Sequence, residues 1–222
     1  MGFIHTESDL DAALARLVAA DPRLAAVLAT AGRPPLRRRP GGFEGLASIV
    51  VSQQLSVASA SAVWTRLGAA LDPFHHETVR RARRSTLQRA GLSAPKIRTL
   101  KAVAAAIHQG AIDLDTLGGV EPEDAHARLT ALHGIGPWTA DIYLLTCLGH
   151  ADAWPAGDLA LQEAARIAFA LASRPTTKEM GPLAEGWRPW RGVAARLLWT
   201  YHRAVKRREA APIQPTASTR RS

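Results

Sequence analysis

The sequence predicts an all-α protein, and three observations support that prediction. Apolar residues recur at helical spacing through most of the 222 residues. No segment alternates apolar and polar residues over the length of a strand, and no Asn-Gly turn joins two β-branched runs. Residues that commonly begin and end helices separate the apolar segments, as Asp21, Pro22 and Gly32 do for a helix between them.

The expected helices can be placed in order along the chain. The first begins at a Ser8 cap, with Asp11 three residues later. A loop rich in proline, glycine and arginine fills residues 33–42. Thr176 and Glu179 form a capping-box pair before a later helix. The other apolar segments predict helices near 43–54, 57–71, 76–91, 94–109, 121–132, 137–149, 159–172 and 189–207.

Charge and cysteine content narrow the function classes. Lys and Arg outnumber Asp and Glu by 28 to 19, so the net charge is +9 and an anionic partner is expected, nucleic acid first. Cys147 is the only cysteine, which excludes an internal disulfide and a cysteine-ligated cluster. No apolar run approaches about 18 residues, and the first ten residues lack the features of a secretory signal. We therefore expect a cytoplasmic protein with no membrane contact.

The most specific local pattern is LTALHGIGPWTADI at 129–142. Its glycines, Gly134 and Gly136, predict a tight turn between two helices in a conformation closed to residues with a β-carbon. The backbone N–H groups of Gly136, Trp138 and Thr139 would then point outward at a helix N-terminus. There they can bind a phosphate oxygen.

This pattern resembles the DNA-binding helix-hairpin-helix of base-excision DNA glycosylases. The resemblance implies two helical lobes with the active-site cleft between them, and damaged double-stranded DNA as the partner. Such hairpins often bind Na⁺ or K⁺ through main-chain carbonyls, which by position would be those of Thr130, Leu132 and Ile135. No cofactor is expected for catalysis. The iron–sulfur cluster of some relatives is excluded, because it needs several cysteines.

A carboxylate follows the hairpin at Asp158, within the segment WPAGD and at the expected start of a helix. The ordinary role of an aspartate there is an N-cap. The resemblance places the family's catalytic aspartate at this spacing, so Asp158 is predicted to be the essential residue. Breaking the C1′–N bond builds positive charge on the sugar, which a fixed anion stabilises while it orients the attacking water.

Trp138 stands where bifunctional relatives carry a lysine nucleophile, and an indole cannot form a Schiff base. The resemblance therefore implies an enzyme without lyase activity. The segment from Trp187 to Trp199 resembles the last-helix motif of the 3-methyladenine DNA glycosylase II family. Trp138 and Trp199 would line a pocket that attracts flat, cationic alkylpurines. Ile142 stands where the family often has tyrosine, and the resemblance implies that Ile142 and the adjacent Tyr143 line the same pocket.

The segment SQQLS at 52–56 resembles the family segment that carries the wedge, the side chain that enters the base stack when the target base leaves. Gln54 lies at the wedge position, with Gln53 and Leu55 beside it. A polar helix junction is the alternative for these residues. The arginine run at 37–39 is a further candidate for phosphate contact, against the alternative of a solvated loop.

We expect one compact domain over 1–205, with the hairpin at about 129–149, a basic and flexible tail over 206–222, and a monomeric protein. The leading hypothesis is a monofunctional DNA glycosylase that flips 3-methyladenine- and 7-methylguanine-type bases and leaves an abasic site in base excision repair. Two alternatives stay open. One is a related glycosylase for deaminated or oxidised bases. The other is a non-catalytic helix-hairpin-helix DNA-binding protein, which would need no carboxylate at Asp158.

Overall fold

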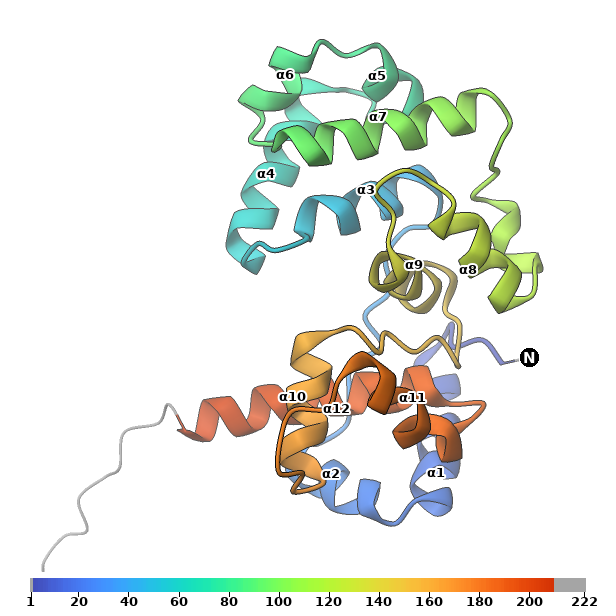
Figure 1. The fold of residues 1–222 in the computed structure, drawn as a ribbon, viewed down its shortest axis with the longest axis vertical. Coiled ribbons are helices and arrows are strands. Elements are labelled where there is room, and N and C mark those ends of the chain that lie inside the picture. Colours follow the sequence, from blue (N-terminus) through green and yellow to red (C-terminus); the bar gives the residue numbers. More distant parts are fainter. Residues whose placement is uncertain (1, 210–222) are drawn as a thin grey trace, which may run out of the picture.

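The computed structural model describes residues 2–209, and this part of the chain is helical with no β-strand (Figure 1). An isolated bridge between Phe3 and His150 is the exception to helix and loop. The all-α prediction is confirmed. Most of the expected tail, residues 210–222, lies outside the described residues, and 206–209 still belong to the last helix. None of the described helices is long and apolar enough to span a membrane.

One lobe, which we call the hairpin lobe, is a continuous stretch of chain over 42–148 (Figure 1). Its core buries Leu46, Leu100 and Ala140, which come from three helices that pack together. The hairpin itself, α8 and α9, lies on the side of this lobe nearest the other lobe. Its elements are α3 (Gly42–Ser52), α4 (Val57–Ala70), α5 (His76–Arg81), α6 (Arg84–Arg89), α7 (Ala94–His108), η1 (Thr116–Gly119), α8 (Pro122–Thr130), α9 (Pro137–Tyr143) and the π-helical turn η2 (Leu144–Leu148).

The second lobe joins the two ends of the described chain, and we call it the terminal lobe. The long helix α12 packs against α1, α2 and α10. The indole N–H of Trp187 donates to the Asp21 carboxylate at 2.8 Å, which links the segment before α12 to the start of α2. The elements of this lobe are α1 (Glu7–Ala20), α2 (Arg23–Ala31), α10 (Leu159–Ala168), α11 (Thr177–Ala184), η3 (Glu185–Trp187) and α12 (Arg191–Glu209).

The chain crosses between the lobes twice, over 32–41 and over 149–158. We call the first crossing the strap. Arg196 of α12 donates to the backbone carbonyl of Leu36 in the strap, and to that of Leu145 in the hairpin lobe at 2.9 Å. Trp199, one turn further along α12, packs against the cores of both lobes. The two lobes are therefore joined along α12.

Two predicted helix starts are wrong by one or two residues. The first helix is capped by Thr6, whose hydroxyl accepts from the N–H of Asp9, and not by Ser8. The second helix begins at Arg23, so Pro22 is its cap and not its first residue. Both shifts leave the buried faces of the helices in the predicted segments. The ends at Gly32 and the capping box of Thr176 and Glu179 are confirmed.

Candidate active site

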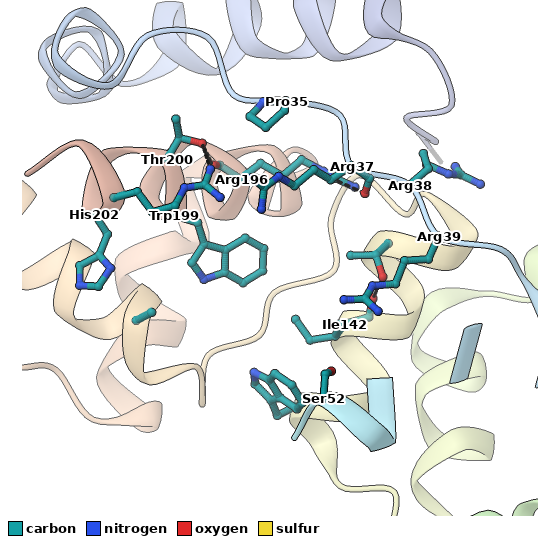
Figure 2. A pocket seen from close by; sticks show the side chains of 14 residues that line it. Pro35, Arg37, Arg38, Arg39, Ser52, Ile142, Arg196, Trp199, Thr200 and His202 are labelled. Atoms are coloured by element: carbon teal, nitrogen blue, oxygen red, sulfur yellow. Dashed lines mark hydrogen bonds between the residues drawn. The ribbon is translucent and has the colours of Figure 1, made fainter. Parts of the chain in front are cut away.

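A cavity of about 590 Å³ lies where the strap passes between the lobes (Figure 2). This volume is within the range of small-molecule sites. Two tryptophans and an isoleucine predicted from the sequence, Trp138, Ile142 and Trp199, line it together. The strap and α12 complete the lining with Pro35, Arg37, Arg38, Arg39, Arg196, Thr200, His202 and Arg203, and Ser52, Thr146 and Ala160 contribute the rest.

The carboxylate of Asp158 is held at the N–H edges of the two indoles that line the cavity. Oδ1 accepts from Trp199 Nε1 at 3.0 Å and from the backbone N–H of Leu161 at 2.8 Å. Oδ2 accepts from Trp138 Nε1 at 2.8 Å. Asp158 is the N-cap of α10, so the capping role and the predicted site role fall on one side chain. Three N–H donors fix both oxygens of this anion.

The tryptophans therefore do more than the sequence suggested. The motif predicted that Trp138 and Trp199 offer ring faces to a base, but it carried no sign that their N–H groups would meet on one carboxylate. Trp138 comes from the start of α9 and Trp199 from the middle of α12. Only the packing of α12 between the lobes brings them together, and that packing has no local sequence signal.

The two hairpin glycines serve different purposes. Gly134 has φ +80, and a β-carbon built on it would overlap the side chain of Thr99 from α7. The prediction of a backbone closed to other residues is confirmed there. At Gly136 it is wrong, because φ is −88 and a β-carbon would meet nothing within 4 Å. Gly136 instead leaves open space beside the first turn of α9, which has no side-chain cap.

The predicted wedge segment is braced from two sides. The side chain of Gln53 donates to the Thr139 hydroxyl at 2.8 Å, which joins this segment to the hairpin. Lys96 of α7 donates to the carbonyl of Gln53 at 2.8 Å and to a second carbonyl at the end of α3. Gln54 has φ +56 and an exposed side chain, and Leu55 is 41% exposed. Gln54 and Leu55 thus form the free tip, while Gln53 is part of its support.

Tyr143 is not a pocket residue, and its placement there is corrected. Its side chain is fully buried in the core of the hairpin lobe. Neighbouring residues of a helix point about 100° apart, so the turn that aims Ile142 at the cavity aims Tyr143 away from it. Asp141, Asp152 and Asp158 are all absent from the cavity lining, but only the carboxylate of Asp158 accepts from two indoles that line it. Asp152 is paired with Arg191 at 2.7 Å.

The arginine run of the strap lies on the cavity wall, and is not only a solvated loop. Arg38 donates to the carbonyl of Cys147 at 2.9 Å, and Arg39 donates to the Ser48 hydroxyl at 2.9 Å. Arg203 of α12 is a further cavity residue that the sequence did not single out. A basic residue four positions after Trp199 on a helix was the available signal, because such residues share a face.

The carbonyls predicted to bind a monovalent cation lie at the end of α8 and in the turn that follows. That of Leu132 accepts from the N–H of Ile135 at 3.1 Å, while those of Thr130 and Ile135 have no backbone donor outside the helices in the described chain. Carbonyl oxygens suit hard cations. These carbonyl oxygens are therefore of the ligand type that Na⁺ or K⁺ needs.

The chain is similar in sequence to known proteins over most of its length. Residues 47–189 match the HhH-GPD superfamily base excision DNA repair protein family. The probable bifunctional transcriptional activator/DNA repair enzyme AlkA of Mycobacterium tuberculosis is 35% identical over 86% of this chain. The match spans 40% of that relative's length. DNA-3-methyladenine glycosylase 1 of Schizosaccharomyces pombe is 31% identical over 71% of either chain.

Two solved structures have a fold similar to that of this chain. The Schizosaccharomyces pombe 3-methyladenine DNA glycosylase Mag1, in complex with abasic DNA, superposes with a TM-score of 0.77 and 29% identity, over 84% of this chain and 94% of that one. The DNA-3-methyladenine glycosidase of Bacillus halodurans has a TM-score of 0.77 and 30% identity, over 93% of this chain and 95% of that one. Both similarities extend over both lobes.

Proposed function

Because the chain belongs to the HhH-GPD superfamily of base excision DNA repair proteins, we propose that it is a monofunctional DNA glycosylase for alkylated purines. It flips the damaged base into the cavity, hydrolyses the N-glycosidic bond and leaves an abasic site. The observation that carries this proposal is the Asp158 carboxylate, which accepts from the indole N–H groups of Trp138 and Trp199, two residues that line that cavity. The names of the similar proteins, which include 3-methyladenine glycosylases, support the substrate class. We expect a monomer that acts in the cytoplasm.

The geometry suits stabilisation of a sugar cation. As the C1′–N bond breaks, positive charge develops on the deoxyribose, and a fixed negative charge beside it lowers the barrier without reorganising. In the described residues, Oδ2 of Asp158 accepts from Trp138 alone. Its remaining lone pair can hold the water that attacks C1′. The alternative of a pure DNA-binding module accounts for the capping bond to Leu161, but it gives no reason for the two indole donors that fix the carboxylate beside the cavity.

The absence of lyase activity is part of the proposal. A lyase needs an amine beside the sugar, and the position that follows the hairpin holds Trp138. The ammonium groups of Lys96 and Lys101 donate to backbone carbonyls of the hairpin lobe, at 2.7 to 3.0 Å. Borohydride treatment of a reaction should therefore trap no covalent protein–DNA adduct, and strand breaks should appear only after alkali or heat. A trapped adduct would overturn this part.

We propose that the hairpin binds the DNA backbone beside the lesion. The N–H groups of Gly136, Trp138 and Thr139, at the start of α9, supply the contacts to phosphate oxygens. Na⁺ or K⁺, held by the carbonyls of Thr130, Leu132 and Ile135, would add positive charge at the same backbone. The exposed tip of Gln54 and Leu55 fills the gap in the base stack, and its two braces hold it rigid enough to do so.

A substitution that removes the charge of Asp158 tests the function. Asp158→Asn should lower the rate of base release by about 10²–10³. Affinity for a duplex with an abasic-site analogue should stay near that of the native protein, because the missing charge acts on the transition state. Asp141→Asn, on the other side of α9, is the matched control and should keep the native rate. A near-native rate in Asp158→Asn would remove this residue from the chemistry.

A second candidate keeps the enzyme and changes the base. The arginines of the strap and Arg203 line the same cavity as the tryptophans, and their charge opposes the attraction that Trp138 and Trp199 offer to a cationic alkylpurine. Neutral deaminated bases are not repelled by these arginines, so the arginines favour their binding relative to that of cationic alkylpurines. Duplexes with 3-methyladenine, 7-methylguanine, hypoxanthine or uracil, each corrected for spontaneous loss, distinguish the two. Faster release of the alkylpurines supports the first candidate, and a preference for hypoxanthine or uracil supports the second.

A further inference from the structure

The arginines around the cavity differ in how the protein satisfies their charge. Arg38 and Arg196 donate to backbone carbonyls of the strap and its neighbours. The guanidinium of Arg37 has no hydrogen-bond or ion-pair partner among the described residues, and Arg203 donates only to the hydroxyl of Thr200, at 3.2 Å. Neither Arg37 nor Arg203 has a carboxylate within ion-pair distance in that part of the chain. No cavity arginine is paired with a carboxylate among the described residues; Arg37 lacks any partner there, and Arg39 and Arg203 each donate to one hydroxyl alone.

These two side chains are also close enough to affect one another. Burial, and then the like charges of Arg37 and Arg207, lower the pKa of Arg203. Such repulsion is relieved when an anion binds between the cations. The strap is built to hold this arrangement: Arg37 has φ +42, in the left-handed region that favours glycine, and Arg196 donates to its carbonyl at 3.4 Å. Strain of this kind is kept where a neighbouring contact fixes it.

We propose that Arg37 and Arg203 bind a phosphodiester group of the flipped nucleotide. This inference rests on the proposed function and adds a second anchor on the DNA backbone, apart from the hairpin. Flipping rotates a nucleotide about its backbone, so the phosphates beside the target base follow it towards the cavity. A guanidinium matches phosphate oxygens in charge and in the spacing of its donors. The strap thus provides a contact from the N-terminal side, and α12 provides one from the C-terminal side.

The salt dependence of DNA binding tests the proposal. The double variant Arg37→Gln/Arg203→Gln should bind an abasic-analogue duplex less tightly, and the slope of log affinity against log salt should fall by about 0.9 for each phosphate that the variant no longer binds. Arg16→Gln/Arg89→Gln removes the same charge from exposed positions that do not line the cavity, and should leave the slope near native. Arg37→Lys/Arg203→Lys keeps the charge and should recover most of the slope. Helical circular dichroism checks that each variant is folded.

Two results would overturn the inference. One is a Gln variant whose slope equals that of the native protein or falls no more than that of the Arg16/Arg89 control. The other is an unchanged slope with slower release confined to bases that carry a carbonyl at C6, which would mean that these arginines contact the base. A native protein that neither binds the abasic duplex nor releases any base would instead contradict the proposed function. The two failures are therefore distinguishable.

Discussion

The two sides of the hairpin helix α9 hold their carboxylates in opposite ways. On the cavity side, Asp158 receives three N–H donors, two of them from indoles. On the other side, Asp141 lies 3.7 Å from His126, and burial raises its pKa to about 7. Both carboxylates lie close to the same helix. The difference shows that N–H donors, and not proximity to the hairpin, determine which carboxylate is held in a fixed orientation.

Substitution of the glycines in the turn before α9 has the largest expected effect on stability. Gly134→Ala should lower the free energy of unfolding by about 3 kcal/mol, because it adds a β-carbon against Thr99 at a positive φ. Gly136→Ala should leave stability within about 0.5 kcal/mol of native, yet weaken binding to an abasic-analogue duplex, since its β-carbon points into the space left for a backbone. Urea unfolding and fluorescence anisotropy measure the two quantities. Equal losses of stability in both variants would contradict this assignment.

On the cavity side of α9, removing one of the three donors to Asp158 has the next largest expected effect. Trp138→Phe keeps an aromatic ring but loses the N–H that reaches Oδ2. A hydrogen bond to a charged group contributes about 2 kcal/mol, so single-turnover base release should slow by about 30-fold. Trp190→Phe, in a half-buried tryptophan that does not line the cavity, is the control and should keep the native rate. A native rate in Trp138→Phe would mean that the indole acts through its ring face alone.

The smallest expected effect is that of replacing Asp141, on the other side of α9. This replacement changes stability and not activity. The folded pKa of Asp141, about 7, lies above the ordinary value of 3.8, so the folded protein holds an extra proton between these values. Its stability should therefore fall as pH rises through that window. Asp141→Asn should be more stable than native at pH 8, by about 1 kcal/mol or more, and less so at pH 5. Parallel urea unfolding at the two pH values measures this. The same loss between pH 5 and 8 in both proteins would contradict it.

Features with local causes were predictable from the sequence. The capping box of Thr176 and Glu179, the end of α2 at Gly32 and the N-cap at Asp158 each depend on side chains within a few residues of the backbone groups that they satisfy. The exception is the first helix. Thr6 with Asp9 and Ser8 with Asp11 both fit the capping pattern. In the structure Thr6 is the N-cap, and the carboxylate of Asp9 accepts from its N–H.

Features of the site that depend on packing could not be predicted. Whether Ile142 or Tyr143 faces the cavity depends on the rotation of α9 about its axis, which the motif does not fix. The strap reaches the cavity because α2 packs on α12, more than 150 residues further along the chain. The same packing brings Trp199 to Asp158. Family resemblance supplied the residues of the site, but not the contacts among them.

The division into lobes also sets an order for assembly during synthesis. The hairpin lobe is one uninterrupted stretch, so its contacts are comparatively local and can form while the rest of the chain is still being made. The terminal lobe must wait, since α1 and α2 find their main partner only when α12 emerges. Asp158 receives its donor from Trp199 at that same late step. A nascent chain can thus fold its hairpin well before it has a complete site for cutting a glycosidic bond.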